Sequence, residues 1–157
     1  MLFRSPCIAP LNAFLILTGM ETLGLRMQRH CDNTLKVAQW LKDNPMVTWV
    51  NYAGLADDKH NALCKKYTPR GAGAVLTFGL KGGYDACVKT VSSVKLFSHL
   101  ANLGDTRSLI IHPSSTTHSQ LSPEQLKQAG AGPEVVRLSV GIEDVADLIA
   151  DLEQAIG

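Results

Sequence analysis

Apolar side chains recur along this chain with two different periods, one typical of helices and one typical of strands. At a spacing of three or four residues they run through most of residues 10–43 and again through residues 145–156. Between these segments lie short runs rich in β-branched residues and bounded by turn-forming residues. In chain order, the pattern predicts a long helix over residues 10–43, strands over 47–50, 74–80, 108–111 and 135–140, and helices over 58–67, 83–94, 122–130 and 145–156.

Several of these elements carry sequence signals at their ends. Asn44-Pro45 ends the long helix, because a residue before proline is disfavoured in the α region. Gly19 and Gly24 lower the helix propensity of its first half, so we expect a bend there. Ser122 is the expected N-cap of a short helix, with Gln125 where a capping box requires it. The boundaries of these two helices therefore depend on local chemistry as well as on periodicity.

About four strands alternate with four or five helices, which predicts a single α+β domain. We expect the helices to cover one face of the sheet and to leave the other face free for a partner. Residues 1–9 are expected to form an N-terminal arm, and residues 10–157 the domain itself.

The composition is that of one folded domain. With 157 residues, 45% hydrophobic and 18% charged, the chain can bury a core and does not resemble disordered proteins. The formal net charge of +1 favours neither a nucleic-acid partner nor an anionic membrane surface. The four cysteines include no C-x-x-C pair, which favours reduced thiols in a cytoplasmic protein. The apolar stretch over residues 8–17 lacks a cleavage-site pattern and is too short to span a bilayer, so we expect no targeting segment.

Residue types with catalytic chemistry are present but form no recognised motif. His112 and His118 have an unusual spacing for metal ligands and no clustered carboxylate or cysteine, so no metal site is predicted. The glycine pairs that flank the strand over 74–80 match neither a dinucleotide-binding fingerprint nor a P-loop, and we interpret them as turn glycines. The serines near the two histidines lack a G-x-S-x-G elbow. We therefore assign no catalytic residue in this chain.

Arg137 is the residue whose position invites a functional interpretation. Strict alternation in the strand over 135–140 places Arg137 and Ser139 on one face, while the opposite, apolar face is the natural core face. A guanidinium in mid-strand, away from the core, is suited to binding a carboxylate in bidentate fashion. On periodicity alone, a solvated arginine or a structural ion pair is the simpler interpretation. These alternatives stay open at this point.

Asn102 and Thr117 are polar residues in segments predicted as loops. Asn102 lies in the turn-like sequence over residues 101–105, where its side chain either satisfies local backbone or donates to a ligand. Thr117 follows a proline and by default is a loop residue. Physical reasoning from the sequence favours the structural interpretation for both.

Several segments together resemble one enzyme family. They are residues 102–105 (NLGD), 108–119 (SLIIHPSSTTHS), 121–124 (LSPE) and 136–144 (VRLSVGIED), with residues 5–14, 19–23 and 26–30 upstream. This combination covers nearly the whole chain and is similar to the C-terminal signature of the Cys/Met-metabolism pyridoxal-phosphate enzymes. Within that family the chain is most similar to the O-acetylhomoserine sulfhydrylases. Residues 71–83 resemble their central strand, and Asn102 stands where γ-lyases usually carry serine.

The resemblance implies a fold, a reaction and a binding pocket. The implied fold is the C-terminal domain of fold-type I transferases, a small and mostly antiparallel sheet preceded by a long helix. The implied reaction is γ-replacement, in which pyridoxal phosphate stabilises carbanions while acetate leaves O-acetylhomoserine and sulfide or a thiol adds, giving homocysteine or methionine. Arg137 would bind the substrate's α-carboxylate, with Asn102 and Thr117 completing that pocket. The whole enzyme is expected to be a homo-oligomer.

The chain departs from this family at the cofactor site. In the family, a large N-terminal domain supplies the Schiff-base lysine, the aspartate facing the pyridine nitrogen and the stacking aromatic residue. None of the nine lysines here lies in the family's cofactor-lysine motif. We therefore expect that the cofactor domain is absent, that the chain has no cofactor-binding residues, and that alone it binds pyridoxal phosphate weakly or not at all and is inactive.

Two kinds of alternative stay open. Within the family, the chain would be a domain of a cystathionine γ-synthase, a cystathionine lyase or a methionine γ-lyase. Outside the enzymes, it would be a freestanding domain that binds an amino acid through Arg137 or pairs its exposed sheet face with another chain.

Overall fold

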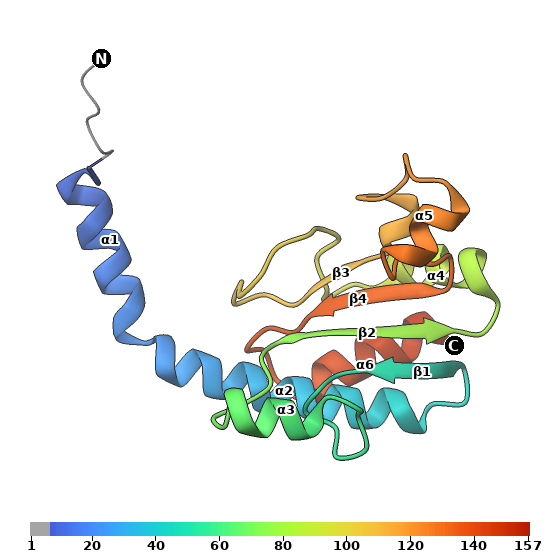
Figure 1. The fold of residues 1–157 in the computed structure, drawn as a ribbon, viewed down its shortest axis with the longest axis horizontal. Coiled ribbons are helices and arrows are strands. Elements are labelled where there is room, and N and C mark those ends of the chain that lie inside the picture. Colours follow the sequence, from blue (N-terminus) through green and yellow to red (C-terminus); the bar gives the residue numbers. More distant parts are fainter. Residues whose placement is uncertain (1–6) are drawn as a thin grey trace.

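The computed structural model describes residues 7–157 and shows an α+β domain built on a four-stranded sheet (Figure 1). This confirms the expected fold class. Most of the predicted arm over residues 1–9 lies outside the described residues, and residues 7–9 precede the first helix. The elements are α1 (Pro10–Glu21), α2 (Leu23–Asp43), β1 (Val47–Asn51), α3 (Asn61–Tyr67), β2 (Val75–Leu80), α4 (Gly83–Ser93), β3 (Leu109–Ile111), the 3-10 turn η1 (Pro113–Ser115), α5 (Pro123–Gln128), β4 (Val135–Ser139) and α6 (Val145–Ile156).

The sheet is antiparallel throughout, in the order β1-β2-β4-β3, so β2 and β4 are its central strands. Thr77 of β2 and Ile111 of β3 lie in register with Arg137 of β4, one on each side. Residues in register point to the same face of a sheet, so these three side chains form one row. We call the face that carries this row the outer face.

The inner face of the sheet packs against helices α2, α4 and α6. Leu76 and Phe78 of β2 and Val136 and Leu138 of β4 are at most 1% exposed on this face. From the helix side, the same core receives Val37, Ala38, Leu41, Cys87, Val91, Leu148 and Leu152. Helices therefore cover one face, as the alternating pattern of the strands predicts.

The single long helix expected over residues 10–43 is two helices, which meet at Thr22. Thr22 has φ −103° and ψ 5°, outside the helical range of its neighbours. Gly19 and Gly24 on either side lower the helix propensity, as the sequence indicates. The Arg26 guanidinium donates to the Gly19 carbonyl and to Thr22 Oγ1. The break falls between the glycines because the arginine pairs a carbonyl that a continuous helix would satisfy internally.

The starts of α3 and β3 are among the boundaries that differ slightly from the prediction. Helix α3 begins at Asn61, after a turn in which Asp58 Oδ1 accepts a hydrogen bond from the His60 backbone N–H (2.8 Å). Strand β3 begins one residue later than expected because the Ser108 N–H donates to the Glu143 carboxylate (2.6 Å).

Two helix starts match their sequence signals. Ser122 and Gln125 form the predicted capping box at α5, with Ser122 Oγ accepting from the Gln125 N–H (3.3 Å) and Gln125 Oε1 accepting from the Ser122 N–H (2.9 Å). Helix α4 opens at Gly82 and Gly83, whose φ angles are 91° and 62°. These left-handed conformations favour glycine, so the glycine pair is a turn, as interpreted from the sequence.

Helix α1 extends away from the body of the domain and buries none of its residues (Figure 1). Its apolar side chains lie on all sides of the helix instead of forming one stripe. Contiguous exposed apolar surface of this kind marks a contact site. Within residues 7–157, no helix combines the length and apolarity needed to cross a bilayer. The exposed large apolar residues of this region are Ile8, Leu11, Phe14, Leu15, Ile16, Leu17, Met20, Leu23, Leu25 and Met27.

The α1 surface is expected to make the chain self-associate as its concentration rises. Replacing Phe14 and Leu17 together by glutamine should shift the chain toward monomer in sedimentation equilibrium, because both are neighbours on one helix face. The melting temperature should stay nearly unchanged, since neither side chain is buried. Leu63→Gln, at a similarly exposed position on α3, is the matched control and should not alter association. A wild-type chain that remains monomeric at every concentration would contradict this expectation.

Candidate functional site

Arg137 lies in the middle of a central strand, with its side chain on the outer face of the sheet. Thr77 and Ile111 flank it in register. Ser139 follows two residues later on the same face and lies in register with Leu109. The alternation seen in the sequence therefore holds in the sheet, and it brings a charged and a polar side chain side by side on the face that the helices do not cover.

The chain between α4 and β3 folds back over part of the outer face. Ser98 pairs with the edge of β3: its N–H donates to the Ser108 carbonyl (2.9 Å), and its carbonyl accepts from the Ile110 N–H (3.0 Å). We call residues 98–108 the cover segment. The outer face, expected to be free, is partly covered at β3 and β4, where residues 100–102 lie against Arg137 and Ser139.

A small cavity of about 10 Å³, the space of a single water molecule, forms between the cover segment and the outer face. Arg137 is the one charged side chain in its lining, and it is half-buried. Arg137 and Asn102, which the family resemblance pairs in one site, therefore line the same pocket. Larger open grooves lie along α2 and β1, but none contains a side chain presented from the sheet's central strands. The lining of the small pocket is Leu100, Ala101, Asn102, Leu109, Ile111, Arg137 and Ser139.

Arg137 has no ion-pair partner among the residues that the structure describes. The two ion pairs found in residues 7–157 join Lys42 to Asp57 and Arg107 to Asp105. A guanidinium set among leucine and isoleucine side chains interacts strongly with an anion, because apolar surroundings lower the effective dielectric. Of the interpretations that the sequence left open, a structural ion pair is therefore not found among residues 7–157.

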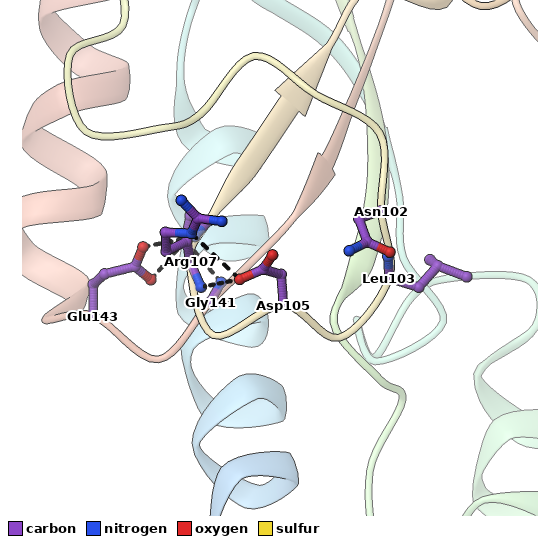
Figure 2. A network of polar contacts seen from close by, with 7 residues as sticks. Asn102, Leu103, Asp105, Arg107, Gly141 and Glu143 are labelled. Carbon is purple, nitrogen blue, oxygen red and sulfur yellow. Dashed lines mark hydrogen bonds and ion pairs between the residues drawn. The ribbon is translucent and has the colours of Figure 1, made fainter. Parts of the chain in front are cut away.

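Asn102 is exposed at the edge of this pocket and is oriented by its own loop (Figure 2). Its Oδ1 accepts a hydrogen bond from the backbone N–H of Leu103 (2.8 Å). With the oxygen engaged, the Nδ2 amino group is the part of the side chain left to donate. The two roles considered from the sequence are therefore compatible, since the oxygen satisfies local backbone while the nitrogen stays available as a donor.

The end of the cover segment is fixed by Glu143, in the turn after β4 (Figure 2). The Glu143 carboxylate accepts from the Ser108 N–H (2.6 Å) and from Ser108 Oγ (2.9 Å), and Ser108 Oγ accepts from the Gly141 N–H (2.7 Å). A side chain at Gly141 would collide with the backbone of Ser108. Nearby, the N–H and guanidinium of Arg107 hold the pKa of Asp105 below its ordinary value. This network ties the cover segment to the strand that carries Arg137.

The chain leading into the cover segment is held by Asp151 of α6, which is buried. Its two oxygens accept from three consecutive backbone N–H groups, those of Lys95 (2.8 Å), Leu96 (2.8 Å) and Phe97 (3.1 Å). Burial by itself would raise the pKa of Asp151, but these hydrogen bonds outweigh it and the pKa lies below its ordinary value. The carboxylate is therefore ionised at neutral pH and clamps this turn to α6.

Thr117, the third residue that the resemblance assigns to the carboxylate pocket, is not in the lining of the small pocket. It is exposed after η1, and its Oγ1 lies 2.8 Å from His118 Nδ1. Its assignment to the pocket stays a prediction.

His112 is fully buried at the end of β3. Its Nε2 lies 2.9 Å from the Pro133 carbonyl and its Nδ1 2.9 Å from Ser115 Oγ, while the Tyr84 ring packs edge-on with centroids 5.0 Å apart. Desolvation lowers the pKa of His112, which keeps the ring neutral at pH 7. Within residues 7–157, no three His, Cys, Asp or Glu side chains gather as a metal site would require.

Sequence reasoning missed the roles of Glu143 and Asp151. Glu143 enters the sequence analysis only as part of the family motif over residues 136–144. The available signal for Asp151 was its position: a carboxylate between Leu148 and Leu152 lies near the apolar face of an amphipathic helix, where it needs partners. Those partners belong to a distant segment, so periodicity did not identify them.

Comparison with known protein families gives a match over almost the whole chain. Residues 5–157 match the family described as Cys/Met metabolism PLP-dependent enzyme. The chain is 58% identical over 153 residues to O-acetyl-L-homoserine sulfhydrylase 1 of Thermus thermophilus and 48% identical over 147 residues to homocysteine synthase of Schizosaccharomyces pombe. These alignments cover 98% and 94% of this chain, but 36% and 34% of the relatives. The chain thus spans about a third of the length of the curated relatives it matches.

A solved structure shares both the fold and much of the sequence. It is described as an O-acetylhomoserine (thiol)-lyase from Campylobacter jejuni, with N'-pyridoxyl-lysine-5'-monophosphate at position 205. The two structures superpose with a TM-score of 0.87 at 47% sequence identity, over 95% of this chain and 35% of that one.

Proposed function

This chain belongs to the Cys/Met metabolism PLP-dependent enzymes, and from that premise we propose that residues 10–157 form the substrate-binding domain of an O-acetylhomoserine sulfhydrylase-like transferase. The reaction would replace the acetate of O-acetylhomoserine by sulfide or a thiol. The role of this domain would be to bind the α-carboxylate of the amino-acid substrate. The observation that carries the proposal is Arg137, a half-buried guanidinium that lines a pocket with Asn102 and has no protein anion within residues 7–157.

The pocket supports carboxylate binding through three features. The planar fork of Arg137 matches both oxygens of a carboxylate, and the Asn102 amino group can donate a further hydrogen bond. Leu109 and Ile111 are buried beside them, which strengthens the charge–charge attraction. A substrate held at this end keeps the bonds that break and form in a fixed orientation, which is the main contribution a binding residue makes to rate.

The cofactor of this family is pyridoxal phosphate, which supplies the electron sink for carbanion chemistry. The residues around Arg137 do not fit this cofactor. Among the described residues, the pocket lining contains no lysine that could react with the aldehyde, and Arg137 is its one cationic group. We therefore propose that this domain contributes the carboxylate site, and that the chain by itself has no transferase activity.

Arg137→Ala is expected to weaken binding of O-acetyl-L-homoserine to this chain by about tenfold to a hundredfold, the range for a charge-assisted hydrogen-bonded pair. The measurement is an NMR titration that follows the backbone amides of β4. Arg137→Lys should lose part of the affinity, because lysine keeps the charge without the bidentate fork. Arg70→Ala, at an exposed position, is the control and should bind as the wild type does.

The same titration with the carboxamide analogue of the ligand tests which group is bound. If the analogue binds as tightly as the acid, or if the wild-type chain shows no shifts in β4, the carboxylate-binding role is wrong.

A further inference from the structure

Ser139 is buried, yet its hydroxyl has no hydrogen-bond partner among the protein atoms of residues 7–157. The residue is 4% exposed and lies on β4, two positions after Arg137. Buried hydroxyls nearly always have a partner, because an unpaired one lowers the stability of the folded state. The hydroxyl of Ser139 is therefore a buried polar group to which the described part of the domain gives no hydrogen bond.

Ser108, which directly precedes the neighbouring strand β3, offers a direct contrast. It is fully buried, and its hydroxyl both donates to Glu143 and accepts from Gly141. The fold thus satisfies one buried serine completely and leaves the other unpaired, although the two residues lie in the same part of the sheet. The difference between them is what they face: Ser108 faces the turn after β4, and Ser139 lines the pocket.

The surroundings of Ser139 explain why the protein supplies no partner. Its neighbours in register are Val75 on β2 and Leu109 on β3, whose side chains cannot form hydrogen bonds. The remaining direction is the pocket itself, which Ser139 shares with Arg137 and Asn102. The protein atoms of residues 7–157 thus offer this hydroxyl no partner, and the direction open to it is this cavity of about 10 Å³.

We propose that Ser139 is a third donor of the carboxylate site, its hydroxyl donating a hydrogen bond to the carboxylate that Arg137 binds. This inference rests on the proposed function. A carboxylate accepts about four hydrogen bonds, so the guanidinium and the Asn102 amide leave room for one more donor. In this arrangement the Ser139 hydroxyl gains its hydrogen-bond partner when the carboxylate binds. The hydroxyl then serves ligand binding and not the stability of the fold.

Ser139→Ala separates these two roles because they predict opposite effects on stability. If the hydroxyl serves the ligand, Ser139→Ala should leave the melting temperature of the ligand-free chain unchanged or raise it, while weakening the binding of O-acetyl-L-homoserine about tenfold. Ser108→Ala, the matched control, should lower the melting temperature. Ser139→Cys keeps the volume of the side chain with a much weaker donor, so it should also fold normally and bind weakly.

The outcomes distinguish this inference from the proposed function. Weaker binding by Ser139→Ala with an undiminished melting temperature supports it. If Arg137→Ala abolishes binding and Ser139→Ala does not change it, the carboxylate site stands and the role of Ser139 is wrong. A melting temperature lowered as in Ser108→Ala also overturns it, since the hydroxyl would then have a structural partner. If the backbone amides of β4 show no chemical-shift change in the wild-type chain, the proposed function is wrong, and the role of Ser139 is wrong with it.

Discussion

Replacing Asp151 with alanine is expected to lower the free energy of unfolding by about 3 kcal/mol, the largest stability effect we predict, because it strands buried hydrogen-bond donors. Three consecutive backbone N–H groups, from Lys95 to Phe97, donate to this one carboxylate. Phe97 is buried and cannot replace the lost partner with water, while the two residues before it are more exposed. The measurement is chemical denaturation at pH 7, with hydrogen exchange of the three amides as the local readout.

The position of the carboxylate on α6 supplies the control. Glu153→Ala lies on the same helix at an exposed position and should change the free energy of unfolding by no more than about 0.5 kcal/mol. Asp151→Asn keeps one acceptor oxygen and should lose an intermediate amount. If Asp151→Ala unfolds at the same denaturant concentration as Glu153→Ala, the clamp contributes nothing to stability.

Asp151 also predicts an acid dependence with a definite sign. Its pKa in the folded state lies below the ordinary value of 3.8, so its contribution to stability is complete above the unfolded-state pKa. The contribution is lost as the pH falls through the lower, folded-state pKa. In Asp151→Asn this part of the acid-induced destabilisation should disappear, which a comparison of unfolding curves from neutral pH downward would detect.

Glu143→Ala is expected to cost about 2 kcal/mol of folding free energy and to weaken ligand binding several-fold through Asn102. The loss leaves the backbone N–H and hydroxyl of Ser108 without their acceptor, so the end of the cover segment is released from the turn at Gly141. Arg137 lies on β4 and keeps its place, so part of the affinity should remain. Hydrogen exchange at Ser108 and titration with O-acetyl-L-homoserine measure the two effects separately.

Glu143→Gln is the matched variant for this second prediction. The amide oxygen can still accept from the Ser108 N–H, so stability should fall by less than in Glu143→Ala. If both variants bind the ligand as tightly as the wild type while Ser108 exchanges faster, the cover segment does not position Asn102 and the coupling is wrong. Unchanged hydrogen exchange of the Ser108 amide in Glu143→Ala would instead show that the hydrogen-bond network of Figure 2 is not maintained in solution.

Much of the fold followed from local pattern, because the elements are short and strongly patterned. Alternation along β4 separated Arg137 from the core residues, and the capping box placed the start of α5. The break at Thr22 was not predicted at its true position, because it depends on a side chain four residues away that pairs the Gly19 carbonyl. Periodicity reports which side of an element is apolar, and it carries no information on such hydrogen bonds.

The sequence by itself determined that Arg137 and Ser139 share the face of a strand that the core does not use, because side-chain direction in a strand alternates with period two. Through its family resemblance, it also predicted that Asn102 belongs with Arg137. Only the tertiary structure decided that residues 98–108 fold back over that face, held near one end by Asp151 and at the other by Glu143. These contacts join segments far apart in the chain, and they form only once the helices and the sheet have set the positions of both carboxylates. The pocket, and the unpaired hydroxyl inside it, are therefore properties of the assembled domain.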